Sequence, residues 1–139
     1  MVKMIEVYSK NVTVAANADI PLNTVALLKG TSTELLGTST IQLNKCGIYQ
    51  VTVTGSVIGS AAGDVIVQLE QNGIAQPEAI STVTAADATS LHPIGFSTLI
   101  QVPNNNNVNC PCSATTTISL RNAGIEATYS SIDVVVTRI

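Results

Sequence analysis

The sequence predicts an all-β sandwich or barrel, and three observations carry this prediction. Between Tyr49 and Val57 the chain alternates, with Tyr49, Val51, Val53 and Val57 on one face and polar residues on the other. Successive side chains of a strand point to opposite faces, so this segment is a half-buried strand. Short alternating segments then recur with turn residues between them, and no segment of useful length has helical periodicity. We therefore expect a compact module built of strands.

The first half of the chain contains one long predicted strand and several short ones. Ile5–Tyr8 is expected as an edge strand, and weak alternation follows at Val12 and Val14 before Asn17 and Pro21 interrupt it. The remaining predicted strands of this half are Thr24–Leu28, Ile41–Leu43 and Gly47–Ile58. Gly59–Gly63 supplies the turn residues that follow the long strand.

The second half continues the pattern up to the chain end. Val65, Val67 and Leu69 share one face, and Asn72-Gly73 then favours the positive φ angles of a tight hairpin turn. The further predicted strands are Ile80–Thr84, Ile94–Val102, Ile118–Leu120 and Ile132–Val136. The loops between them are Ala85–Ser90, the run Asn104–Asn107 and the turn at Asn122-Ala123-Gly124.

The last predicted strand differs from the others because it is apolar on both faces. Val135 lies on the face that Asp133 and Thr137 share. A strand that is apolar on both faces is usually buried on both. This predicts a second layer outside the sheet, such as another subunit; the alternative is an isolated exposed valine, which is common.

Length and composition indicate one domain, spanning residues 1–139, with a substantial core. Apolar residues make up 45% of the chain, but charged residues only 11%, against about 25% in ordinary globular proteins. Thr, Ser, Asn and Gln take the place of charge. Such residues suit a pleated surface and a surface that is partly buried against partners.

The charge pattern argues against nucleic acid and membranes as partners. The net charge is −3, and the six lysines and arginines are scattered, whereas phosphate binding needs a basic footprint. Aromatic residues make up only 3%, too few for base stacking. We see no signal peptide and no apolar run near the roughly 20 residues of a membrane span. We expect synthesis in the cytoplasm without membrane insertion.

The residue types that perform catalysis are sparse. His92 is the only histidine, and no partner for it can be placed, whereas a hydrolytic triad needs a nucleophile, a base and an orienting group. Acidic residues are dispersed, with no pair placed for glycosidase chemistry. Asp64 or Asp87 lacks the neighbouring acids of a calcium site. We expect a protein that is not an enzyme and has no cofactor or metal.

Three cysteines, Cys46, Cys110 and Cys112, do not make a disulfide framework because their number is odd. Three alternatives are open. Cys46 pairs with Cys110 or Cys112, giving at most one intrachain disulfide; or the thiols stay reduced and buried. The third alternative is a thiolate site, in which zinc would still lack a fourth ligand unless subunits converge on an axis.

Several segments carry a family resemblance in their order and spacing. They are Ile41-Gln42-Leu43 followed by Gly47-Ile48-Tyr49-Gln50-Val51-Thr52-Val53, then Val65–Gly73, Ile94–Val102, Ile118–Gly124 and Ile132–Ile139. Together they resemble the tumour necrosis factor (TNF)/complement globular-head family. The resemblance implies a ten-strand jelly roll that assembles as a tight homotrimer. We expect a head without a collagen-like or coiled-coil stalk, and the cysteines make the chain most similar to small stalkless proteins of Firmicutes and their phages.

These inferences predict a homotrimeric structural or adhesive protein of a phage or prophage particle, as a fibre head or capsid decoration. Its partners would be phage capsid or tail proteins or a host surface glycan, and its location the virion. The alternatives are a bacterial cell-surface or spore-coat trimer and a lectin-like binder. The residues predicted between subunits are Leu99, Val135, Tyr129, Gln101 and Thr52. The predicted recognition loops contain Asp87, Asn104, Asn105, Asn106 and Asn107.

Overall fold

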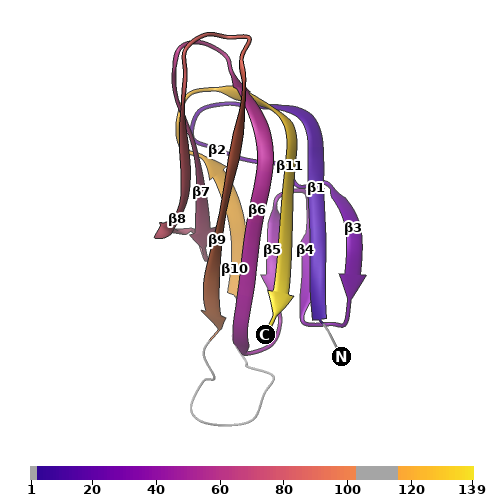
Figure 1. The fold of residues 1–139 in the computed structure, drawn as a ribbon. Helices are drawn as coiled ribbons and strands as arrows, with labels where there is room; N and C mark the ends of the chain where they lie inside the picture. Colours follow the sequence, from indigo (N-terminus) through magenta and orange to yellow (C-terminus); the bar gives the residue numbers. More distant parts are fainter. Residues whose placement is uncertain (1–2, 103–115) are drawn as a thin grey trace.

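The computed structural model describes residues 3–102 and 116–139, which form two facing antiparallel sheets (Figure 1). The five-stranded sheet has the order β3-β1-β11-β6-β9, and the six-stranded sheet has the order β4-β5-β10-β7-β8, with β2 paired to β10. The strands are β1 (Lys3–Val14), β2 (Ala18–Asp19), β3 (Thr24–Lys29), β4 (Thr33–Leu36), β5 (Thr40–Leu43), β6 (Gly47–Gly59), β7 (Gly63–Gln71), β8 (Ile74–Ala85), β9 (Leu91–Val102), β10 (Thr116–Asn122) and β11 (Ala127–Arg138).

The core lies between the two sheets and is built from the alternation seen in the sequence. In β6 the residues Tyr49, Val51, Val53 and Val57 are all fully buried. β6 pairs with β11 on one side and with β9 on the other, so this long strand is central in its sheet. The predicted half-buried strand is confirmed, because its alternate side chains reach the core and the others point outward.

One polar network is buried with the apolar core. Asn122 is fully buried, and its Nδ2 donates to the carbonyls of Val14, Ala15 and Ile125 at 2.9–3.2 Å. The hydroxyl of Tyr129 donates to Oδ1 of Asn122 at 3.0 Å. This network ties the ends of β1, β10 and β11 together, and burial raises the pKa of Tyr129.

The hairpin between β7 and β8 has the turn that Asn72-Gly73 predicts. Asn72 has a φ of 53° and Gly73 a φ of 81°, and the flanking residues Gln71 and Ile74 pair with each other. Two consecutive positive φ angles are the requirement of a type I′ turn, which Asn-Gly meets at low cost.

The structure corrects three predictions about strands. The described residues contain eleven strands instead of ten, because the two-residue β2 and the short β4 each pair through backbone bonds that leave little sequence pattern. β1 runs from Lys3 to Val14 and lies between β3 and β11, so it is not an edge strand. β8 starts already at Ile74 and includes Pro77, which an edge strand tolerates.

Candidate subunit-interaction face

The outer face of the five-stranded sheet is the surface turned away from the core, and strand pairing defines its residues. In the middle of this face one row crosses all five strands. It consists of Leu27, Glu6, Val135, Thr52 and Ser97. The row on one side is Thr24, Tyr8, Asp133, Thr54 and Gly95, and the row on the other is Lys29, Met4, Thr137, Gln50 and Leu99. This face is therefore assembled from segments at both ends and in the middle of the chain.

Four of the five residues predicted between subunits belong to this outer face. Val135 and Thr52 are paired neighbours, and the hydroxyls of Thr52 and Ser97 are 3.3 Å apart. Leu99 is 59% exposed on β9, an edge strand of this sheet. Gln101 follows on the same face of β9, since the alternating Ile100 and Val102 are buried.

The fifth residue, Tyr129, was placed wrongly by the sequence-based prediction. Its side chain is fully buried inside the sandwich and bonded to Asn122. A register shift between Tyr129 and Ser131 inserts Ser130 into the pairing of β11 with β6. Because of this bulge, Tyr129 lies on the core side although Ser131, Asp133, Val135 and Thr137 follow the outward alternation. Tyr129 cannot contact a second subunit.

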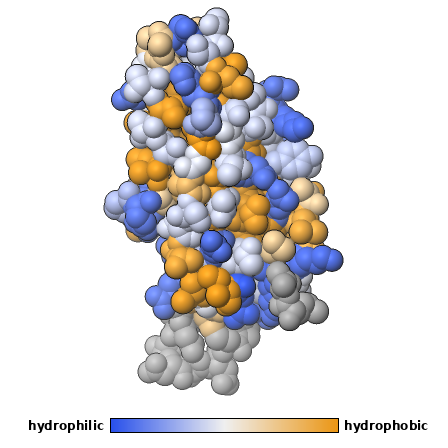
Figure 2. All heavy atoms as spheres, viewed as in Figure 1, coloured by the Kyte–Doolittle hydropathy of each residue, from blue (hydrophilic) through white to orange (hydrophobic). Residues whose placement is uncertain are grey.

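Charge is distributed unevenly over the outer face of the five-stranded sheet. The half formed by β6 and β9 presents Gln50, Thr52, Thr54, Ser97 and Leu99, none of which is charged. The charged residues lie toward β11, β1 and β3 and are Asp133, Glu6, Lys10 and Lys29. Figure 2, which views this side of the molecule, shows apolar and weakly polar residues interspersed over much of the surface.

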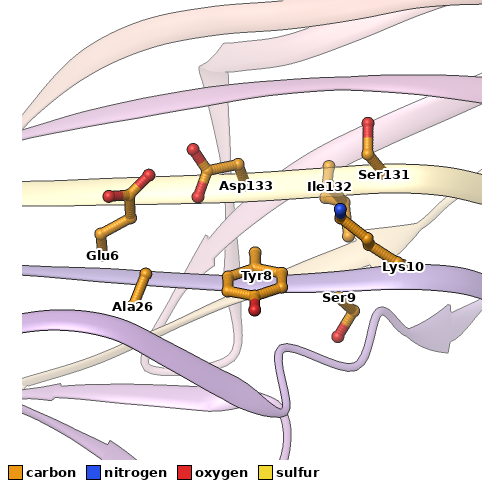
Figure 3. Close-up of a pocket in the computed structure, with 8 residues that line it drawn as sticks. All are labelled: Glu6, Tyr8, Ser9, Lys10, Ala26, Ser131, Ile132 and Asp133. Carbon is orange, nitrogen blue, oxygen red and sulfur yellow. The ribbon is translucent and has the colours of Figure 1, made fainter.

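A hollow of about 350 Å³ lies in the charged half of this face. It is lined by Glu6, Tyr8, Ser9, Lys10, Ala26, Ser131, Ile132 and Asp133 (Figure 3). The carboxyl groups of Glu6 and Asp133 point toward each other there, and Lys10 lies on the far side of Asp133. The hollow forms where register shifts displace β3 against β1 and β11 against β6.

The Asp133 carboxyl has an unusual environment. Burial raises its pKa to about 6, and a hydrogen bond and the charge of Glu6 act in the same direction, while the backbone N–H of Val134 opposes them. Its Oδ1 is buried and has no hydrogen-bond partner. Glu6 could not be identified from the sequence, because only the pairing of β1 with β11 brings it beside Asp133.

The two predicted recognition loops adjoin opposite ends of β9. The loop before Leu91 contains Asp87, whereas the run Asn104–Asn107 follows Val102 at the other end of the strand and lies outside the described residues. Asp87 accepts hydrogen bonds from the backbone N–H groups of Thr89 and Ser90 at 2.9 and 2.8 Å.

These bonds show that the Asp87 carboxylate stabilises the conformation of its own loop. The hydroxyls of Thr89 and Ser90 also contact it, at 3.1 and 3.2 Å. The two backbone bonds, followed by these hydroxyls, lower the pKa of Asp87 to about 2. Because the carboxylate is already held by four local donors, the loop is a preformed turn that presents small polar side chains.

Cys46 is buried directly before β6 and is disulfide-bonded. Its carbonyl accepts a hydrogen bond from Nη2 of Arg138 at 2.7 Å, which ties the start of β6 to the end of β11. A zinc site that uses the Cys46 thiolate, and a fully reduced set of thiols, do not fit this bonded sulfur. Cys110 and Cys112 lie outside the described residues, so the choice of partner stays a prediction.

The described residues contain little that could support catalysis or metal binding. His92 lies on β9 opposite Val57, and its Nε2 is buried without a hydrogen-bond partner. No group of three or more metal-ligating side chains occurs within residues 3–102 and 116–139. The same residues include no helix of the length and apolar character that a membrane span requires. The absence of enzymatic activity stays a prediction.

Comparisons with known proteins give a consistent fold. No protein-family model and no curated protein matches the chain. Among solved structures, Eiger TNF from S. frugiperda matches with a TM-score of 0.69 and 11% identity over 99% of this chain and 93% of that one. Murine APRIL matches with a TM-score of 0.66 and 7% identity, each chain being covered completely.

A third match comes from a different kind of protein. The vertex protein P5 of PRD1 has a TM-score of 0.58 and 18% identity over 99% of this chain and 96% of that one. At these identities the similarity concerns the fold alone. The two sheets, their strand order and these matches agree: the chain has the jelly-roll fold of the TNF-like globular heads.

Proposed function

We propose that this protein forms a homotrimer through the outer face of the five-stranded sheet. We further propose that the trimer is a non-enzymatic structural or adhesive component of a phage or prophage particle. The observation that carries the proposal is the uncharged half of that face, where Leu99 is 59% exposed beside Gln50, Thr52 and Ser97. A face of this kind is suited to contact with copies of itself.

The absence of charge from the β6–β9 half of the face is what we expect of a contact between copies. A solvent-exposed sheet face normally carries charged residues that keep a protein soluble. In a closed symmetric assembly, a charge near the axis meets its own copies, so neutral and apolar residues are favoured there. Ile48, which is 45% exposed on β6, extends the apolar surface next to Leu99. Val135 fills the middle of the same face and is only partly covered within one chain.

The role in a particle is supported by the match to the vertex protein of PRD1. That match spans nearly the whole of both chains, and the matched protein is a component of a phage particle. Trimerisation would present three copies of each loop on one rigid body. Three weak contacts joined in this way bind far more strongly than one, because the second and third become intramolecular. The preformed turn at Asp87 is one such loop.

A pair of matched variants tests the proposed interface. Leu99→Lys places a charge in the uncharged half of the outer face, and Ile74→Lys places the same charge on an isoleucine that is 68% exposed at the hairpin of β8. Sedimentation equilibrium at micromolar concentration should give a trimer for the wild type and for Ile74→Lys, and monomers for Leu99→Lys. A wild-type monomer would refute the proposal.

The adhesive role needs a separate measurement. Fluorescently labelled wild-type protein should bind to host cells more strongly than monomeric Leu99→Lys at equal subunit concentration. A glycan array then identifies whether a surface sugar is the ligand. If the trimer binds neither cells nor glycans but is found in purified particles by mass spectrometry, a purely structural part is indicated in place of an adhesive one.

A further inference from the structure

Glu6 and Asp133 form a carboxyl pair on the outer face of the five-stranded sheet. Glu6 pairs with Val135 and Tyr8 pairs with Asp133, so Glu6 and Asp133 are diagonal neighbours on two adjacent strands. Diagonal positions lie about 7–8 Å apart at the backbone, within reach for long side chains. Figure 3 shows both carboxyl groups directed toward each other at the edge of the hollow.

The surroundings of the pair do not neutralise it. On β1 the facing titratable groups are Tyr8 and Lys10, and on β3 the nearest charged group is Lys29, one row away from Glu6. β6 contributes only the uncharged Thr52 and Thr54. Within the described residues neither carboxylate takes part in an ion pair, and Oδ1 of Asp133 is buried without a partner.

Two carboxylates this close repel each other when both are ionised, and desolvation adds to the repulsion. The raised pKa of Asp133, about 6, reflects these same causes. A proton held between the two groups removes one charge and supplies the donor that a carboxyl–carboxylate hydrogen bond requires. The pair in one chain is therefore poised to accept one proton in mildly acidic solution.

We propose that the copies take up protons at the Glu6–Asp133 pair when their outer faces come together, so that mild acid favours the trimer. This inference rests on the trimer of the proposed function and concerns how that interface is regulated. Each proton comes from the solvent and converts a carboxylate into a carboxylic acid. A second copy that covers the hollow removes water from the pair, and an ionised carboxylate loses more by this than a neutral one.

The lysine beside the hollow could give the opposite pH dependence, in which acid weakens the trimer. Lys10 is exposed on the same face. If assembly brought Lys10 of one copy against the carboxyl pair of another, the ion pair would favour the ionised form. Acid would then weaken the trimer, and assembly would release protons instead of taking them up.

Sedimentation velocity of the full chain between pH 5 and pH 8 at constant ionic strength separates these cases. We expect the trimer association constant to be at least about tenfold larger at pH 5.5 than at pH 8. With one proton taken up per subunit, linkage limits the change to about a thousandfold per pH unit. As a second measurement, diluting the trimer in calorimeter buffers of different ionisation enthalpy should show protons released on dissociation.

Two neutral variants and one matched control assign the effect. Asp133→Asn and Glu6→Gln should each keep the trimer and remove most of the pH dependence, leaving association at pH 8 close to that of the wild type at pH 5.5. Asp64→Asn changes an exposed aspartate of the six-stranded sheet that accepts a hydrogen bond from Thr84 at 2.9 Å. This control should retain the full pH dependence of the wild type.

The outcomes distinguish this inference from the proposed function. A wild-type trimer that is independent of pH, or weaker in acid, overturns proton uptake but leaves the trimer standing. Proton uptake at this pair is also overturned if trimer association of both neutral variants depends on pH as strongly as that of the wild type. A chain that is monomeric at every pH overturns both proposals together.

Discussion

The two outer faces of the sandwich differ in how their charges are arranged. On the six-stranded sheet, Arg121 pairs with Glu70 at 3.6 Å and Asp64 accepts a hydrogen bond from Thr84. On the five-stranded sheet, the β6–β9 half has no charge, and the two carboxyls of the other half face each other without a cation bonded to them. The first arrangement is typical of a surface in water, and the second is what we expect of a surface that contacts other copies of the chain.

The exposed apolar residues follow the same division. On the six-stranded sheet they lie on its two opposite edge strands, with Leu36 on β4, and Ile74 and Ile80 six residues apart on β8. Single exposed apolar residues are normal on soluble proteins. On the five-stranded sheet, Ile48 and Leu99 lie on adjacent strands, and Val135 lies on the next strand across the same face. Ile48 and Leu99 are diagonal neighbours, and the uncharged Gln50 and Thr52 lie between Leu99 and Val135, so no charge interrupts this part of the face.

The largest effect is expected when a carboxylate is placed at the centre of the proposed interface. Val135→Asp would stand directly beside Glu6 on β1 and two residues from Asp133. Three copies would bring these charges together in a poorly hydrated site, where repulsion and desolvation add. We expect trimer association at pH 8 to weaken by at least about a hundredfold, or roughly 3 kcal/mol.

Light scattering coupled to size-exclusion chromatography measures this change. The matched control is Thr82→Asp, at an exposed position of β8 on the other sheet, which should remain trimeric. A Val135→Asp protein with unchanged mass and melting temperature would show that the outer face of the five-stranded sheet is not where the copies meet.

A smaller effect is expected when the carboxyl pair is neutralised in a monomeric background. The pKa of Asp133 is about 6 in the folded chain, above its ordinary value of 3.8. The stability gained from its proton is fully present below pH 3.8 and is lost as the pH rises through 6. Asp133→Asn in Leu99→Lys should therefore stabilise the fold at pH 8, by at most about 1 kcal/mol because solvent screens the pair.

Urea unfolding of Leu99→Lys, with and without Asp133→Asn, at pH 4 and pH 8 measures this difference in stability. The two unfolding curves should nearly coincide at pH 4 and separate at pH 8, with Asp133→Asn the more stable. Equal stability at both pH values would mean that the Asp133 carboxyl carries no unfavourable charge in the monomer, and it would weaken the contrast between the two faces.

The smallest effect on stability should come from a substitution on the outer face of the six-stranded sheet. Arg121→Ala removes the ion pair with Glu70, which bridges β10 and β7 on the six-stranded sheet. Arg121 is 40% exposed, and such surface pairs contribute only about 0.2–1 kcal/mol. Thermal unfolding should show a small loss that disappears in high salt, and trimer association should stay as in the wild type.

Local sequence pattern was sufficient for the elements whose structure depends on neighbouring residues. The alternation of Tyr49, Val51 and Val53 predicted which side of β6 is buried, because a strand reverses its side chains at every residue. Asn72-Gly73 predicted the hairpin turn, because its positive φ angles are a property of those two residues. The same alternation predicted that Val135 shares a face with Asp133 and Thr137, whereas the contact of Leu99 and Val135 with other subunits stays a prediction.

Tertiary structure decided what depends on residues far apart in the chain. A single bulge at Ser130 moved Tyr129 into the core, and no local pattern marks that extra residue. Glu6 and Asp133 meet only because β1 pairs with β11 in one particular register. Backbone pairing also created β2 and β4, whose side chains carry little periodicity. Side-chain alternation is local and can be predicted from the sequence, whereas register is set by the packing of the whole sandwich.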